Sequence, residues 1–281
     1  MSVPVLSRKG GRGGYDLGAP CTAAESVVPA PILLVLDHAV QALPWESSFL
    51  MMEQEGASGD DSCSEFYRVP SLPVALSCHS DPSASVSPAT KSFDSTYYVI
   101  NPSGDLVSTQ ESFEAWFKNL AGWSGVSGRV PTPDELGTAL EEHDLFVYCG
   151  HGGGEQYLPV SRLRSLGSCA SSVLMGCSSA KVTTGGVYDA SGVPLSYLTA
   201  GSHAVVGNLW DVTDKDIDRY CTALITSMLE NPRGKANLGA LVQKCRLNCR
   251  LMYLIGASPV VYGLPVRFRS GVQRRGETPL I

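Results

Sequence analysis

The chain has 281 residues, of which 43% are hydrophobic and 17% charged, as in a folded protein with one large or two modest domains. A net charge of −6 without a long basic run argues against nucleic-acid binding. No stretch approaches the roughly 18–20 apolar residues that span a bilayer, and no signal peptide is recognisable. The nine cysteines fit buried thiols better than a disulfide framework.

Composition divides the chain into a central domain and two ends. Residues 1–26 are glycine-rich and aperiodic, which predicts a disordered lead-in, and residues 271–281 are expected to form a tail. The domain between them spans residues 27–270. Inside it, the acidic stretch 54–65 and the stretch 77–92, which is dense in serine and proline, predict surface insertions.

The first half of the domain predicts two strands and two helices. Apolar runs over residues 32–36 and 97–100 favour strands. A helix follows the second run, with one apolar stripe made of Phe113, Trp116, Phe117 and Leu120. Thr132-Pro-Asp-Glu135 is a capping box with proline at the first helical position, so the next helix begins there and ends near residue 143.

The second half continues the alternation of strands and helices. Apolar runs predict strands over residues 145–149, 172–175, 204–207 and 260–262. Helices are predicted over residues 194–200 and 237–254. Between them, Thr213 is predicted to cap a third helix, whose inward-facing residues are Ile217, Tyr220, Leu224 and Met228. Such alternation predicts an α/β fold with a mostly parallel central sheet. In these sheets, functional loops gather at the carboxyl ends of the strands.

A cysteine and a histidine stand at two such strand ends. Cys177 follows the apolar run that ends at Met175, and His151 follows the run that ends at Cys149. Each could be a core residue. However, glycine and serine neighbours mark a tight turn at Cys177. A free thiol has a pKa of ~8.5, so it needs a neighbouring group such as an imidazole to supply thiolate. The pair therefore predicts thiol-dependent acyl transfer.

Three glycines follow His151, and they favour a loop that can direct amide groups at an oxyanion. The natural donors are the backbone amides of Gly152 and Cys177. A phosphate-binding loop is disfavoured because no Lys-Ser/Thr follows the glycines. Ser178 and Ser179 are poor nucleophile candidates because no Gly-x-Ser-x-Gly elbow surrounds them.

Four carboxylates, Asp211, Asp214, Asp216 and Asp218, open the helix after Thr213. Acidic residues at a helix N-terminus oppose its dipole favourably, which is one explanation. The alternative is that one of them turns into a cleft and recognises a cationic side chain, best an arginine. Metal ligation has no support: Cys245 and Cys249 lie one helical turn apart, but no partners stand at zinc-ligand spacing.

At these residues the chain resembles the protease domain of separase, a family of caspase-like cysteine endopeptidases that open cohesin at anaphase. The segments Asp144–Gly152 and Leu174–Ala180 are similar to the family's histidine and nucleophile segments, and Gly207–Arg219 is the most specific match. Leu43–Ser47 and Pro259–Pro265 are similar to its first and last landmarks. Separases are normally far longer, with a helical N-terminal region, so the resemblance is to the catalytic portion.

The resemblance implies a role for each matching residue. Cys177 is expected as the nucleophile and His151 as the catalytic histidine, with Gly152 and Cys177 amides as the oxyanion hole. Family substrates are cut after arginine, usually with an acidic residue a few positions before it. The group that holds this arginine is expected to be Asp218, with Asp216 and Asp214 as alternatives. Gly153 stands where the family often has a slightly larger residue.

The resemblance also implies partners and setting. The expected substrate is a cohesin kleisin subunit, the expected inhibitor is securin-like, and the expected location is cytoplasm and nucleus. No cofactor, metal, direct nucleic-acid contact or membrane contact is implied. Two other functions remain open: a caspase-like protease of the CHAT type, which the Trp210–Arg219 segment disfavours, and a non-catalytic binding or decoy domain, which the presence of His151 and Cys177 disfavours.

Overall fold

A computed structural model describes residues 30–48, 64–70, 88–183, 190–231, 234 and 237–270. The predicted lead-in and tail lie outside the described residues, as does most of each predicted insertion. The described parts are the last two residues of the first insertion and the end of the second, where Ala89–Ser92 forms strand β3 and pairs in parallel with β12 (Val266–Arg269). A stretch predicted as surface insertion thus ends in regular structure.

The centre of the molecule is an eight-stranded sheet in the order β1-β2-β11-β10-β7-β6-β4-β5. Neighbouring strands are parallel except β10 and β11, which confirms the predicted α/β class. The strands are β1 (Ile32–Val35), β2 (Phe66–Val69), β11 (Pro259–Gly263), β10 (Ala204–Asn208), β7 (Ser171–Leu174), β6 (Leu145–Cys149), β4 (Thr96–Ile100) and β5 (Trp123–Ser127). A short antiparallel pair, β8 (Val182–Thr183) and β9 (Ser191–Gly192), lies apart from this sheet.

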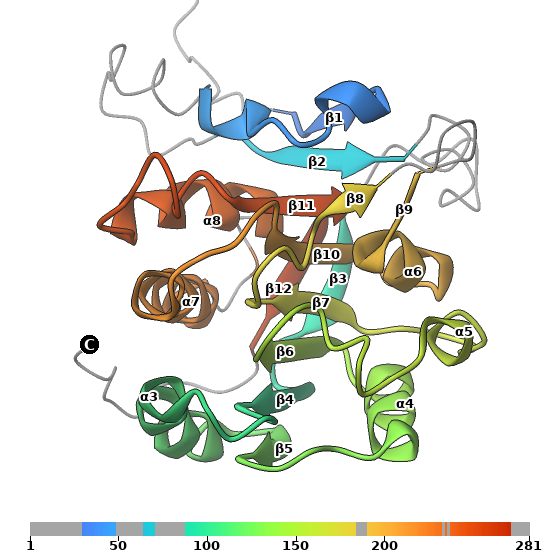
Figure 1. The fold of residues 1–281 in the computed structure, drawn as a ribbon, viewed down its shortest axis with the longest axis vertical. Coiled ribbons are helices and arrows are strands. Elements are labelled where there is room, and N and C mark those ends of the chain that lie inside the picture. Colours follow the sequence, from blue (N-terminus) through green and yellow to red (C-terminus); the bar gives the residue numbers. More distant parts are fainter. Residues whose placement is uncertain are drawn as a thin grey trace, which may run out of the picture.

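Helices cover both faces of the sheet (Figure 1). On one side lie α3 (Val107–Lys118), α7 (Asp214–Leu229) and α8 (Leu238–Cys245), and on the other α4 (Pro133–Glu142), α5 (Val160–Leu163) and α6 (Val193–Thr199). Alternate residues of each strand face opposite layers, as the two-residue period of a strand requires. In β6, for example, Val147 packs in the core with α3 and α7, while Phe146 and Tyr148 pack in the core with α4 and α6.

Local sequence signals explain where the main helices begin. At α4 the Thr132 hydroxyl accepts the Glu135 amide and the Glu135 carboxylate accepts the Thr132 amide, so the predicted capping box is present. Thr213 occupies the N-cap position of α7, but its side chain makes no cap hydrogen bond. The four residues predicted to face inward from α7 are buried: Ile217, Tyr220, Leu224 and Met228.

The predicted helix over residues 237–254 is wrong in length. The helix α8 ends at Cys245, a 3-10 turn covers Arg246–Asn248, and turns continue to β11. The buried Arg246 guanidinium donates to the Gly256 carbonyl at 2.9 Å, which holds the chain folded back on itself. The apolar pattern continued past the break, but of residues 249–254 only Cys249 enters the core, whereas Leu251 and Leu254 are exposed.

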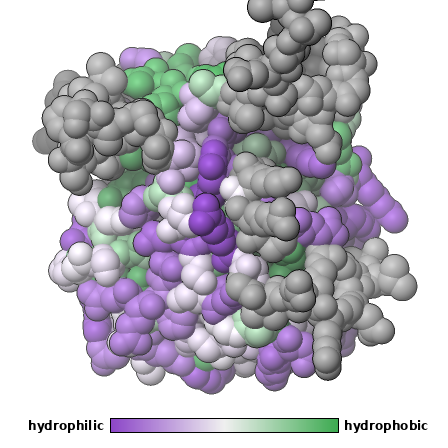
Figure 2. Space-filling model, turned by 180° about the vertical axis from the view of Figure 1, so that it is seen from behind, coloured by the Kyte–Doolittle hydropathy of each residue, from purple (hydrophilic) through white to green (hydrophobic). Residues whose placement is uncertain are grey.

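Seen from behind, the described surface is mainly hydrophilic, with hydrophobic side chains in separate patches (Figure 2). Most large apolar side chains are in the two core layers. None of the helices among the described residues is long and apolar enough to cross a membrane.

Candidate active site

The sheet brings together the loops that follow β4, β6 and β7. These strands are neighbours and parallel, with Ile100 beside Cys149 and Tyr148 beside Leu174, so their carboxyl ends meet at one edge. His151 lies just after β6 and Cys177 just after β7. The N-terminal part of α7 and the start of α3 close the same edge, because α7 and α3 pack on one face of the sheet.

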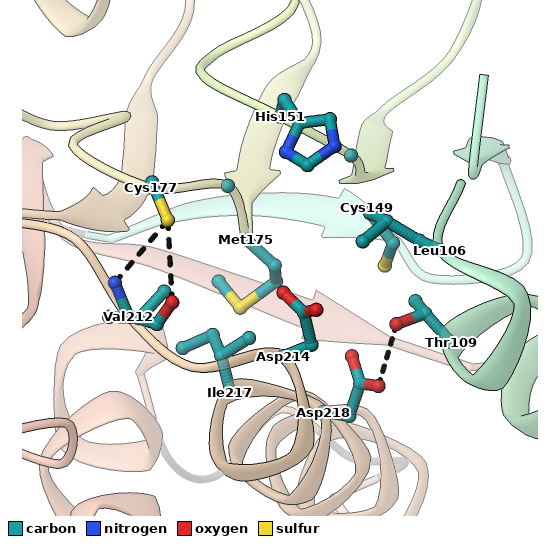
Figure 3. A pocket seen from close by; sticks show the side chains of 12 residues that line it. Leu106, Thr109, Cys149, His151, Met175, Cys177, Val212, Asp214, Ile217 and Asp218 are labelled. Carbon is teal, nitrogen blue, oxygen red and sulfur yellow. Dashed lines mark hydrogen bonds between the residues drawn. The ribbon is translucent and has the colours of Figure 1, made fainter. Parts of the chain in front are cut away.

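These loops and helices enclose a cavity (Figure 3). The cavity is narrow, with a volume of about 20 Å³, close to one water position. Its walls combine a thiol, an imidazole, two carboxylates and apolar side chains. They are Leu106, Thr109, Cys149, Gly150, His151, Met175, Gly176, Cys177, Val212, Asp214, Ile217 and Asp218.

Cys177 is the accessible thiol of this site. Its sulfur contacts the Val212 backbone, donating to the carbonyl oxygen at 3.4 Å and accepting the Val212 amide at 3.4 Å. Cys177 is part-exposed, whereas the other described cysteines, Cys149, Cys169, Cys221, Cys245 and Cys249, are buried. Burial raises the pKa of Cys169 and Cys249 to about 12, so these thiols stay protonated and inert at neutral pH.

The turn that carries Cys177 is braced by the segment after β10. Ser178 has a φ of 53°, uncommon for a residue with a side chain. Its amide donates to the Trp210 carbonyl at 3.1 Å and its hydroxyl to Asp211 Oδ1 at 2.7 Å. Asn208 Nδ2 donates to the Gly176 carbonyl at 3.0 Å. The Gly207–Arg219 segment therefore positions the nucleophile turn, a role that sequence reasoning missed.

The loops of Cys177 and His151 are in backbone contact at Gly176. A Cβ atom at Gly176 would lie 2.1 Å from the Gly152 carbonyl oxygen and 2.7 Å from the Gly152 amide nitrogen. Only glycine permits this approach. The contact places the amide of Gly152 beside the residue that precedes Cys177. Gly152 itself has a φ of +64°, and the next amide, Gly153 N, donates to Glu155 Oε2 at 2.8 Å.

His151 is held at both its backbone and its ring. Its carbonyl accepts the Tyr148 hydroxyl at 2.7 Å and Gln156 Nε2 at 2.9 Å. Its ring Nε2 donates to Asp105 Oδ2 at 2.8 Å, and this hydrogen bond lowers the pKa of Asp105. Sequence reasoning missed Asp105. The available signal was its position after the Asn101–Gly104 turn that ends the strand neighbouring β6.

Two of the three predicted pocket carboxylates line the cavity. Asp218 is 6% exposed, and burial raises its pKa to about 6 against the opposing effect of the Thr109 hydroxyl, which donates to Asp218 Oδ2 at 2.8 Å. Asp214, one helical turn earlier, is exposed at the rim. Figure 3 shows both rising from α7 toward the cavity, with Thr109 opposite Asp218.

Asp216 points elsewhere. Its carboxylate accepts the backbone amides of Arg250 and Leu251, each at 2.8 Å, and pairs with Arg219 at 2.9 Å. Burial alone would raise the pKa of Asp216, but these donors outweigh it and hold the pKa below its usual value. The structure therefore assigns Asp216 to the junction of α7 with the chain after α8, outside the cavity.

Among the described residues there is no group of three or more histidine, cysteine, aspartate or glutamate side chains placed to hold a metal ion.

Comparison with known proteins identifies the family. Residues 19–217 match the family described as the separin protease domain. Separin of Mus musculus is 40% identical over 242 residues, which make up 85% of this chain and 11% of the mouse protein. The chain belongs to the separin protease-domain family. It thus corresponds in length to a small part of the curated separins that it matches.

Solved structures agree with the separin assignment. The chain matches separase in the crystal structure of the Saccharomyces cerevisiae separase–securin complex with a TM-score of 0.75 and 34% identity, covering 85% of this chain and 16% of that one. It also matches the Arg specific cysteine proteinase gingipain R with a TM-score of 0.52 and 12% identity, covering 74% of this chain and 56% of the other. The second likeness concerns the fold alone. Together they confirm the predicted caspase-like fold.

Proposed function

We propose that this separin-family domain is a cysteine endopeptidase that cleaves peptides after arginine. The observation that carries the proposal is that Cys177, His151 and two carboxylates, Asp214 and Asp218, line one cavity. A thiol nucleophile, a proton acceptor and an anionic subsite are the groups that hydrolysis after a cationic residue requires.

The proposed reaction follows from the two loops. His151 accepts the thiol proton of Cys177, and the thiolate attacks the peptide carbonyl. The amides of Gly152 and Cys177 stabilise the tetrahedral oxyanion; the backbone contact at Gly176 supports this role because it sets the Gly152 amide beside the nucleophile turn. His151 then returns the proton to the leaving amine, and water hydrolyses the acyl-enzyme.

Asp218 is the proposed partner of the substrate arginine. It is buried, and its carboxylate hydrogen bonds Thr109 at the cavity wall, so an arginine that reached it would form a charge-assisted contact away from water. Asp214 at the rim would add a second negative charge. Because the cavity is narrow, the arginine must displace apolar wall side chains such as Met175 and Leu106. Methionine is suited to this movement by its flexible side chain.

The biological setting is proposed from the family. We infer that the substrate is a cohesin kleisin subunit and that the domain acts in the cytoplasm and nucleus. A securin-like protein is the proposed inhibitor, since the yeast relative was solved as a separase–securin complex.

The test is cleavage of a fluorogenic peptide that ends in Glu-x-x-Arg. We expect hydrolysis by the 281-residue chain, loss of hydrolysis in Cys177→Ser, and poor hydrolysis when citrulline, an uncharged isostere, replaces the arginine. An arginyl acyloxymethyl ketone should alkylate Cys177 alone among the cysteines, as read by mass spectrometry. If Cys177→Ser cleaves like the wild type, the nucleophile is misassigned. If Cys177 is not alkylated, the result favours the alternative that the chain is a non-catalytic binding or decoy domain.

A further inference from the structure

Asp105 pairs with His151, which lines the cavity. The carboxylate accepts a hydrogen bond from His151 Nε2 at 2.8 Å, while both side chains remain exposed. Asp105 comes from the loop after β4, His151 from the loop after β6 and Cys177 from the loop after β7. Three consecutive strands of the sheet therefore deliver a carboxylate, an imidazole and a thiol in that spatial order.

Exposed ion pairs usually contribute little, because two long side chains must be ordered in solvent. The loop that carries Asp105 removes much of this entropic cost. Its anchor is Asn101, which is buried and has a φ of 47°. The Asn101 side chain accepts the Leu106 amide at 2.8 Å and donates to Gln110 at 2.9 Å, while its backbone amide donates to the Cys149 carbonyl at 2.8 Å.

This anchoring fixes Asp105 relative to β6, because Asn101 bonds directly to the last residue of that strand. The residue after Asp105, Leu106, is held by the Asn101 side chain and lines the cavity. On the far side, Ser103 and Tyr157 share a hydrogen bond of 2.9 Å between their hydroxyls. The carboxylate thus meets the imidazole on a loop tied down at several points.

We propose that Asp105 is the positioning residue of His151: it keeps a proton on Nε2 and orients the ring so that Nδ1 receives the Cys177 proton. A neutral imidazole carries one N–H, and a carboxylate on Nε2 selects the tautomer with the proton there. Figure 3 shows one ring nitrogen of His151 on the Cys177 side of the imidazole and the other on the opposite side. The proposal rests on the proposed thiol chemistry of this site.

The spectroscopic test does not depend on catalysis. In the chain labelled with 15N-histidine, two-bond 1H–15N spectra report the tautomer of each of the five histidines, and His151→Gln assigns the signal of interest. We expect the Nε2–H tautomer in the wild type and its loss in Asp105→Ala. Asp105→Asn should retain it, because the amide oxygen still accepts a hydrogen bond. Glu111→Gln, which removes an exposed carboxylate from α3, is the matched control and should change nothing.

The kinetic test separates positioning from binding. With the arginyl peptide, Asp105→Ala should lower kcat by up to about a hundredfold with little change in KM, because a misplaced base affects chemistry and not substrate affinity. Asp105→Asn should restore part of kcat. The proposal is overturned if Asp105→Ala keeps the wild-type tautomer, or keeps the wild-type kcat. If the wild-type chain cleaves no peptide, the proposed function fails, and the tautomer comparison still decides for or against the Asp105–His151 pair.

Discussion

Asp216 and Asp218 stand on the same helix, yet their surroundings shift their pKa values in opposite directions. Asp216 has two amide donors and an arginine, and its pKa is lowered. Asp218 has one hydroxyl donor, and burial raises its pKa to about 6. A charge that is well paired stabilises the fold, whereas a charge that is buried with little compensation destabilises it. The free-energy cost of burying the Asp218 carboxylate is the cost expected at a binding site for a cation, because in the proposed complex the bound cation would compensate the buried charge.

Exchange of each aspartate for asparagine tests this contrast. The folded pKa of Asp218 lies above its unfolded value, so its ionised form destabilises the protein as pH rises from about 4 through 6. Asp218→Asn should therefore raise the free energy of unfolding at pH 8, by on the order of 2–3 kcal/mol, and should abolish cleavage after arginine. Urea unfolding at pH 5 and pH 8 measures the effect, which should be about half as large at pH 5 because only part of the pKa difference is expressed there.

Asp216→Asn is the control with the opposite sign. The folded pKa of Asp216 lies below its unfolded value, so its contribution is present above about pH 4 and is lost as pH falls through the folded pKa. The variant should lose stability at pH 8 because an amide oxygen cannot serve Arg250, Leu251 and Arg219 together. Equal shifts of the same sign in both variants would contradict the assignment.

The sequence predicted that Cys177 and His151 lie side by side, since both follow apolar runs and the carboxyl ends of parallel strands share an edge, and both residues line one cavity. The sequence could not show which of the aspartates lines the cavity, because that depends on which side of α7 packs against the chain after α8. It also could not pair Asp105 with His151: the turn before Asp105 marks a strand end, but the two residues are 46 positions apart in the chain. Contacts of this kind depend on strand order, and the sequence leaves strand order open.

At the scale of elements, the junction of two loops depends on Gly176. Gly176→Ala places a methyl group 2.1 Å from the Gly152 carbonyl oxygen, and that oxygen belongs to backbone that cannot rotate away. The loops must separate, which displaces the Gly152 amide and Cys177 from each other. We expect kcat for the arginyl peptide to fall by about a hundredfold or more, since a shift of about 1 Å can cost that much.

Gly137→Ala controls for the added methyl group. Gly137 lies inside α4, and its new Cβ would be 3.7 Å from the nearest atom, an ordinary contact. The variant should keep full activity and gain about 0.5–1 kcal/mol, because alanine favours the helix over glycine. If Gly176→Ala keeps activity as Gly137→Ala does, the two loops do not need their backbone contact.

Elements with strong local signals were predicted well. The strand Leu145–Cys149 and the capped helix α4 match their predictions, because an apolar run and a capping box each depend only on residues close together in the sequence. The strand β2 was not predicted because it is four residues long with Arg68 inside it, a residue that ordinarily marks surface. The edge strand β5 contains Gly125, which weakens the strand pattern.

At the scale of the whole molecule, Arg68 of strand β2 connects the segment Leu43–Ser47 to the sheet. Its guanidinium, 1% exposed, pairs with Glu46 through Nε at 2.7 Å and Nη2 at 2.8 Å, and also donates to the Leu43 carbonyl at 2.6 Å. The Glu46 carbonyl in turn accepts the Gln243 side chain from α8. The predicted landmark Leu43–Ser47 is thus explained by packing: it supplies the partners of a buried cation.

Removal of Glu46 tests how much this connection matters. Glu46→Ala leaves Arg68 buried without its counter-charge, and breaking one side of a buried pair costs about 3–5 kcal/mol. We expect the urea midpoint of unfolding to fall strongly. Cleavage of the arginyl peptide should be lost only at urea concentrations at which the segment Leu43–Ser47 detaches from the sheet. Lys118→Gln, which breaks an exposed pair with Glu114, should leave the midpoint unchanged because solvent screens that pair. A midpoint for Glu46→Ala equal to that of Lys118→Gln would mean that Arg68 finds other partners, and that the segment Leu43–Ser47 is held to the sheet by its apolar contacts.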